Sequence, residues 1–185
     1  MSNTLAVTVL LAFVGYVVTY FNSVRLEQRK AKLKFVSDQL QYLYGPLFSL
    51  NSASIEAWTA FRSRYRPGGP FFRQGDPPSE EELKQWRLWM QEVFMPLNLQ
   101  MRQAIIENTH LVEGDGMPQS FRDLLAHVEV YKITIKKWEA GDFSEHTSYL
   151  DFPSEFRREV QAQFAMLKSR QAGLIGARSR RGAQA

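Results

Sequence analysis

An uncharged, strongly apolar stretch at residues 5–21, LAVTVLLAFVGYVVTYF, constrains this chain more than any other feature of its sequence. Its seventeen residues are close to the number that an α-helix needs to cross a bilayer core about 30 Å thick. Apolar side chains would cover the whole circumference of such a helix, whereas a helix on a domain surface is apolar on one side only. The stretch therefore predicts a transmembrane segment within residues 1–22. A buried core helix of a globular domain is the alternative.

The residues that flank this stretch indicate its orientation. Tyr16 and Tyr20 lie at its C-terminal end, where amphipathic rings are favoured at the level of the headgroups. Basic residues follow at Arg25, Arg29, Lys30, Lys32 and Lys34, whereas the four residues before the stretch carry no charged side chain. A cleaved signal peptide would have its basic residues on the other side. By the positive-inside rule we expect a single-pass signal anchor with the N-terminus outside and the following domain in the cytoplasm.

Charge is unevenly distributed over the rest of the chain. Residues 35–167 carry 13 basic and 18 acidic residues, so the body is acidic. Residues 168–185 carry five basic residues and no acid. A nucleic-acid-binding protein would concentrate its positive charge on the folded body, so we expect no nucleic-acid partner. The absence of cysteine excludes disulfides, thiolate metal sites and cysteine nucleophiles.

Apolar residues at three- and four-residue steps predict an all-α fold, in which the transmembrane helix continues into a cytoplasmic bundle of about four helices. A basic juxtamembrane helix at 23–45 is expected to kink or break at Gly45-Pro46. The bundle domain, 46–172, contains a helix that Pro96 should bend. A disordered basic tail is expected at 173–185. The predicted bundle helices span roughly 46–65, 80–112 and 118–140, with a last one from 153.

A loop at 66–79, RPGGPFFRQGDPPS, contains two adjacent phenylalanines, Phe71 and Phe72. Such a pair in a long polar loop either folds back onto the domain or inserts into a membrane interface or a partner's groove. We treat both rings as candidate interaction residues. Ser79 and Glu82, which follow the loop, match a capping box that begins the next helix.

The sequence contains one pattern typical of a metal site, Glu107-x-x-His110, with Asp123 and His127 beyond the next turn. A helical wheel places the first three of these residues away from the apolar stripes and His127 at a stripe edge. A second Glu-x-x-His is missing, and no glycine-rich phosphate loop or nucleophile motif occurs. We therefore assign no catalytic, cofactor-binding or metal-binding residue, and expect no cofactor.

These features favour a binding function: a membrane-anchored interaction module or accessory subunit that holds a protein partner at the bilayer. Two other classes stay open, a membrane-acting effector that oligomerises through its anchor and a membrane-bound enzyme with an undetected site in the bundle. Arg178, Arg180 and Arg181 in the tail are further candidate interaction residues, because anionic lipid or an acidic partner surface would attract them.

Overall fold

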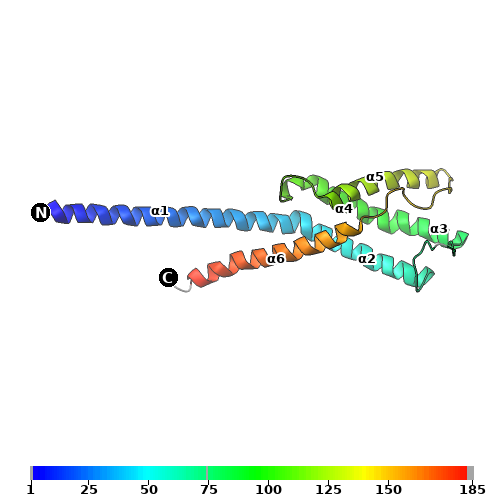
Figure 1. The fold of residues 1–185 in the computed structure, drawn as a ribbon, viewed down its shortest axis with the longest axis horizontal. Coiled ribbons are helices and arrows are strands. Elements are labelled where there is room, and N and C mark those ends of the chain that lie inside the picture. The colour runs from blue at the N-terminus through cyan, green and yellow to red at the C-terminus, as the bar shows by residue number, and fades with distance from the viewer. Residues whose placement is uncertain (1, 74, 183–185) are drawn as a thin grey trace. The chain divides into compact units, whose positions relative to one another are not determined.

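A computed structural model describes residues 2–73 and 75–182, with side chains for 5–73 and 75–176 (Figure 1). Within these residues the chain consists of helices and loops without a β-strand, which confirms the all-α prediction. The chain divides into two compact units. One contains Met1–Ser37 and Ser169–Ala185, and the other contains Asp38–Lys168.

The first unit is built on α1, Ser2–Asp38. The apolar side chains of α1 are exposed along the predicted membrane span. The continuous helix Leu5–Tyr65 contains an 18-residue window with a mean hydropathy of 1.9, and 0% of this window is buried. This is one helix long and apolar enough to cross a membrane, as judged by length and composition. The alternative of a core helix requires burial that residues 5–21 do not have.

The C-terminal part of α6, Ser154–Gly182, belongs to the same unit as α1. Arg29 donates to the carbonyl oxygen of Leu174 at 2.9 Å, and the amide of Gln171 donates to Ser37 Oγ at 3.1 Å. The helix continues through Gly173, where the sequence predicted the start of a disordered tail. Of the predicted tail, residues 173–182 belong to α6, and residues 183–185 lie outside the described backbone.

The second unit contains α2 (Gly45–Tyr65), α3 (Glu80–Trp89), α4 (Met95–Glu107), α5 (Gln119–Glu139) and the first part of α6. The helix α4 packs against both α2 and α5 (Figure 1). A short 3₁₀ helix, η3 (Thr109–Leu111), precedes the turn into α5. At the end of α4 the amide of Asn108 donates to the carbonyl oxygen of Ala104 at 3.0 Å.

Two π-helical segments interrupt the α-helices, and each lies just before a proline. The first, η1 (Gln39–Tyr44), precedes Pro46, and the second, η2 (Met90–Phe94), precedes Pro96. Proline lacks an N–H and its ring clashes with the carbonyl four residues earlier, so a wider turn accommodates it without ending the helix. The predicted irregularities at Pro46 and Pro96 therefore take the form of π turns.

The interior of the second unit has an aromatic cluster around Phe61, whose ring is fully buried. Its ring centroid lies 4.9 Å from that of Phe71 and 5.4 Å from that of Trp89. Further along the unit, Phe48 stacks on Phe164 of α6 with centroids 4.4 Å apart. Fully buried leucine and methionine side chains on α2, α4, α5 and α6 complete the core: Leu47, Met101, Leu124 and Leu167.

Arg66 fastens the loop 66–79 to the start of α3. Its guanidinium donates to Glu82 at 2.7 and 2.9 Å and to the Asp76 carboxylate at 2.8 Å. The predicted capping box is present, because Ser79 Oγ accepts from the Glu82 N–H and Glu82 accepts from the Ser79 N–H. The hydrogen bonds from Arg66, followed by those from Ser79, lower the pKa of Glu82 to about 2. The carboxylate therefore stays ionised and keeps the loop closed.

Candidate functional site

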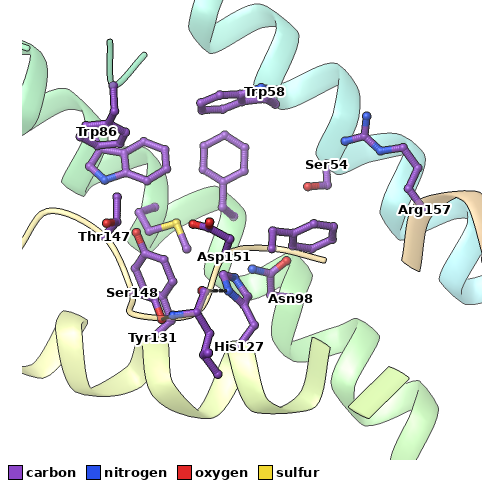
Figure 2. Close-up of a pocket in the computed structure, with 15 residues that line it drawn as sticks. Ser54, Trp58, Trp86, Asn98, His127, Tyr131, Thr147, Ser148, Asp151 and Arg157 are labelled. Carbon is purple, nitrogen blue, oxygen red and sulfur yellow. Dashed lines mark hydrogen bonds between the residues drawn. The ribbon is translucent and has the colours of Figure 1, made fainter. Parts of the chain in front are cut away.

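A cavity of about 310 Å³ lies within the unit Asp38–Lys168 (Figure 2). Its walls come from α2, α3, η2, α4, α5, the start of α6 and two loops, 66–79 and the one between α5 and α6. The volume falls at the lower end of the range of small-molecule pockets, about 300–1,000 Å³. Thr147, Asp151 and Arg157 line it and are also exposed, so the cavity opens to solvent on the side of this loop.

Aromatic rings from three elements form one wall of the cavity. Trp58 of α2, Trp86 of α3 and Phe94 of η2 are in mutual contact, with ring centroids about 6 Å apart. Phe72 stands edge-on to Trp86 at 5.5 Å and remains 38% exposed at the rim. Such a wall presents ring faces and edges to any group that enters.

Three side-chain N–H groups hold the loop between α5 and α6, which lines the cavity. The indole of Trp86 donates to the carbonyl oxygen of His146 at 2.7 Å, and the indole of Trp138 donates to that of Glu145 at 2.7 Å. His127 Nδ1 lies 2.6 Å from the carbonyl oxygen of Leu150. Irregular backbone needs such partners when it covers a core, and these three bonds fix the loop over α5.

The wheel placed His127 at the edge of an apolar stripe, whereas the structure buries it. The side chain is 4% exposed and lies between Tyr131 and Phe152, with ring centroids 5.5 and 5.7 Å away. Burial lowers the pKa of His127, while the carbonyl of Leu150 and the charge of Asp151 oppose that shift. The imidazole is therefore neutral near pH 7. Because a carbonyl can only accept, Nδ1 carries the proton and Nε2 keeps a lone pair.

Two other buried side chains of the cavity contain polar atoms without a hydrogen-bond partner in the described part of the chain. These atoms are Asn98 Oδ1 and the hydroxyl oxygen of Tyr131. Each residue is 3% exposed. Burial raises the pKa of Tyr131 against the smaller opposing effect of the nearby Trp86 indole, so the hydroxyl stays protonated. Figure 2 shows Asn98, His127 and Tyr131 on one side of the cavity, across from Trp58.

Sequence reasoning missed Asn98 because of the π segment before it. A wheel at 100° per residue places Val93 and Leu97 on the stripe, but these two are only partly buried, whereas Phe94, Met95 and Asn98 are buried. The extra residue in the π turn of η2 shifts the buried positions by one. The only sequence signal for this shift is Pro96, which predicted an irregularity but not its phase.

The predicted site residues do not meet at this cavity, with one exception. Phe72 lines the cavity, whereas Phe71 is 1% exposed within the aromatic cluster. The membrane-flanking residues lie along α1: Tyr16, Tyr20, Arg25, Arg29, Lys30, Lys32 and Lys34. The side chains of Arg178, Arg180 and Arg181 lie outside the described ones.

Among the residues that the structure describes, no group of three or more histidine, aspartate or glutamate side chains could hold a metal ion. Glu107 and His110 of the Glu-x-x-His pattern are both exposed. Asp123 is exposed as well, and it accepts from the side chain of Gln119 at 2.6 Å. We therefore base the site on the cavity alone.

Comparison with known proteins gives no relative: no protein-family model, curated protein or solved structure matches this chain.

Proposed function

We propose that this protein is a membrane-anchored interaction module that holds a protein partner at the bilayer through the cavity of its helical unit. The observation that carries the proposal is the cavity: its lining is mainly apolar, it opens to solvent, and its buried wall contains polar atoms without a hydrogen-bond partner among the described residues. Specific binding pockets combine an apolar lining with a few placed polar groups in this way. A membrane span on the same chain would confine the bound partner to the membrane surface.

The orientation proposed for this module follows from charge. Arg25, Arg29, Lys30 and their basic neighbours lie directly after the apolar stretch. Basic residues next to a span are retained on the cytoplasmic side, so the N-terminus is outside and the helical unit is cytoplasmic. Added protease should spare the helical unit in intact cells and digest it after the membrane is opened. Digestion from outside in intact cells would contradict this orientation.

Arg178, Arg180 and Arg181 support a further membrane contact within this proposal. Each basic residue near an anionic surface contributes about 1 kcal/mol of attraction, screened over roughly 8 Å at physiological salt. The acidic body would otherwise be repelled from anionic lipid, so the basic segment offsets that repulsion. Replacing the three arginines by glutamine should weaken binding to anionic vesicles at low salt.

Photo-crosslinking in cells tests the partner-holding function. A photoreactive phenylalanine derivative in place of Thr147, at the exposed rim, should give a discrete crosslinked product. The same derivative in place of Ile133, which is 55% exposed on α5 and does not line the cavity, serves as the control. The product should disappear when Ser54→Phe fills the cavity and persist with the exposed Ser63→Phe. No product at residue 147, or one that Ser54→Phe leaves unchanged, would contradict the proposal.

A further inference from the structure

The polar side of the cavity offers hydrogen-bond acceptors as well as the N–H donors of the Asn98 amide. Asn98 Oδ1 accepts no hydrogen bond in the described part of the chain, and His127 Nε2 carries a lone pair because Nδ1 donates to Leu150. The hydroxyl of Tyr131 can either donate or accept, and apart from the nearby indole of Trp86, whose N–H donates to His146, it has no partner there. Buried polar groups are normally satisfied, so these atoms indicate that a hydrogen-bonding group completes the site.

The opposite side of the cavity favours an aromatic ring as the part of the ligand that carries the hydrogen-bonding group. The rings of Trp58, Trp86 and Phe94 provide apolar area with the electrostatic pattern of aromatic faces and edges. Met90, which is 3% exposed, adds a polarizable thioether to the same lining. A flat aromatic group would use both the rings and the thioether.

Charge does not select an ion at this site. Asp151 and Arg157, one charge of each sign, both lie at the exposed rim. The side chains deeper in the cavity are a neutral imidazole, an amide and a protonated phenol. An ion moved into such surroundings loses hydration without gaining a buried counter-charge. A neutral group is therefore the better complement.

We propose that this cavity binds a neutral aromatic group bearing a hydroxyl or N–H donor, the chemistry of a phenol or an indole. The donor contacts the side of the cavity formed by Asn98, His127 and Tyr131, and the ring packs on the aromatic wall. We assign this aromatic group to a tyrosine or tryptophan side chain of the partner, and this assignment rests on the proposed function. A free small molecule could present the same chemistry, and the experiment separates the two sources.

The test uses the full chain in lipid nanodiscs with ¹³C-labelled methionine methyl groups, observed by NMR. The probes are p-cresol and 3-methylindole, which carry a donor, and toluene, which does not. The methyl signal of Met90 should shift on titration, whereas that of buried Met101, which does not line the cavity, should not. We expect p-cresol to bind at least about tenfold more tightly than toluene, because toluene leaves the buried polar atoms unpaired.

Two variants remove the polar side of the cavity separately. Asn98→Leu and Tyr131→Phe should each reduce the preference for p-cresol over toluene several-fold. Asn51→Leu is the matched control for the first, since Asn51 is 1% exposed, has no hydrogen-bond partner for its amide among the described residues and does not line the cavity. Tyr42→Phe, at a tyrosine 49% exposed, is the control for the second. If Asn98→Leu does not fold, Tyr131→Phe decides the matter alone.

The outcomes distinguish the cavity chemistry from the identity of its occupant. Equal binding of p-cresol and toluene, no shift of Met90 with any probe, or an unchanged preference in both cavity variants would overturn the inference. If N-acetyl-tyrosinamide binds at least as well as p-cresol, the source is a protein side chain. If p-cresol binds with the expected preference and N-acetyl-tyrosinamide does not bind, the donor chemistry holds, and the partner source and the proposed function fail.

Discussion

The imidazole of His127 connects the core, the loop and the cavity of the helical unit. Its Nδ1–H donates to Leu150, its ring lies between Tyr131 and Phe152, and it lines the cavity. Protonation would place a charge in these buried surroundings, and the Leu150 carbonyl and the nearby Asp151 charge do not fully compensate for the lost hydration. The residue therefore couples the stability of the unit to pH.

We predict that the unit loses stability as the pH falls from about 7.5 to 5.5 because of His127. Its folded pKa is lowered by burial, so the unfolded chain takes up the proton first as the pH drops below the ordinary value of 6.5. Stability is thus complete above that value and declines below it. Asp142, Glu129, Glu145 and Glu82 have lowered pKa values and titrate at more acidic pH. Urea midpoints of the full chain in detergent measure the effect.

His127→Gln should flatten this dependence, whereas the control His110→Gln, at an exposed position, should retain it. An equal slope in the wild type and in His127→Gln would show that another group is responsible.

A second residue-scale prediction concerns Phe61, whose buried ring contacts the rings of Phe71, Trp86, Trp89 and Phe94. Phe61→Ala removes about 3–5 kcal/mol of stability, the usual cost of deleting a buried ring and leaving a cavity. Chemical denaturation of the full chain in detergent would measure it. Tyr42→Ala, at an exposed position, should change stability by less than about 0.5 kcal/mol. A cost for Phe61→Ala near that of the control would mean that the aromatic cluster is not a packed core.

At the scale of the elements, the π turns decide which residues face the interior. Each π turn ends with a hydrogen bond from a backbone N–H to the carbonyl oxygen five residues earlier. Gly45 donates to Leu40 in the first turn, and Met95 donates to Met90 in the second. Met95 shows that such a turn can accept a side chain. At Gly45 an added Cβ would lie 2.2 Å from the carbonyl oxygen of Leu40, so the first turn is tighter there.

Gly45→Ala should therefore destabilise the protein by about 1–3 kcal/mol, the typical cost of overpacking, despite the higher helix propensity of alanine. The clash is with backbone, which cannot move aside as a flexible side chain could. Gly173→Ala is the matched control, because an added Cβ meets nothing within 4 Å at that helical position. Thermal denaturation by circular dichroism compares the two. A gain in stability for Gly45→Ala would show that the π turn relaxes to an ordinary helix without cost.

At the scale of the whole molecule, the compact unit Asp38–Lys168 contains the cavity and the aromatic cluster, and residues 5–21 lie outside it. We predict that a chain limited to residues 38–168 is helical and unfolds cooperatively, because its apolar faces pack on one another. Circular dichroism and urea denaturation would measure both properties. A soluble but non-cooperative chain would mean that the core needs the remainder of the protein.

The sequence by itself determined the features that depend on local chemistry. The apolar stretch, the helical periodicity, the capping box at Ser79 and the disturbance at each proline follow from side-chain types and their spacing. These patterns were sufficient for the all-α class and for a helix able to cross a membrane, because each depends on neighbours within a few residues.

Only the tertiary structure decided what faces the cavity. Asn98 is buried because a π turn shifts the helix phase by one residue, and His127 is buried because a loop about twenty residues later folds over it. Phe71 joins the core while its neighbour Phe72 stays at the rim. A helical wheel drawn with a constant angle per residue cannot predict the phase shift at the π turn or the loop that covers His127. The site is therefore assembled by contacts between elements, which no local pattern encodes.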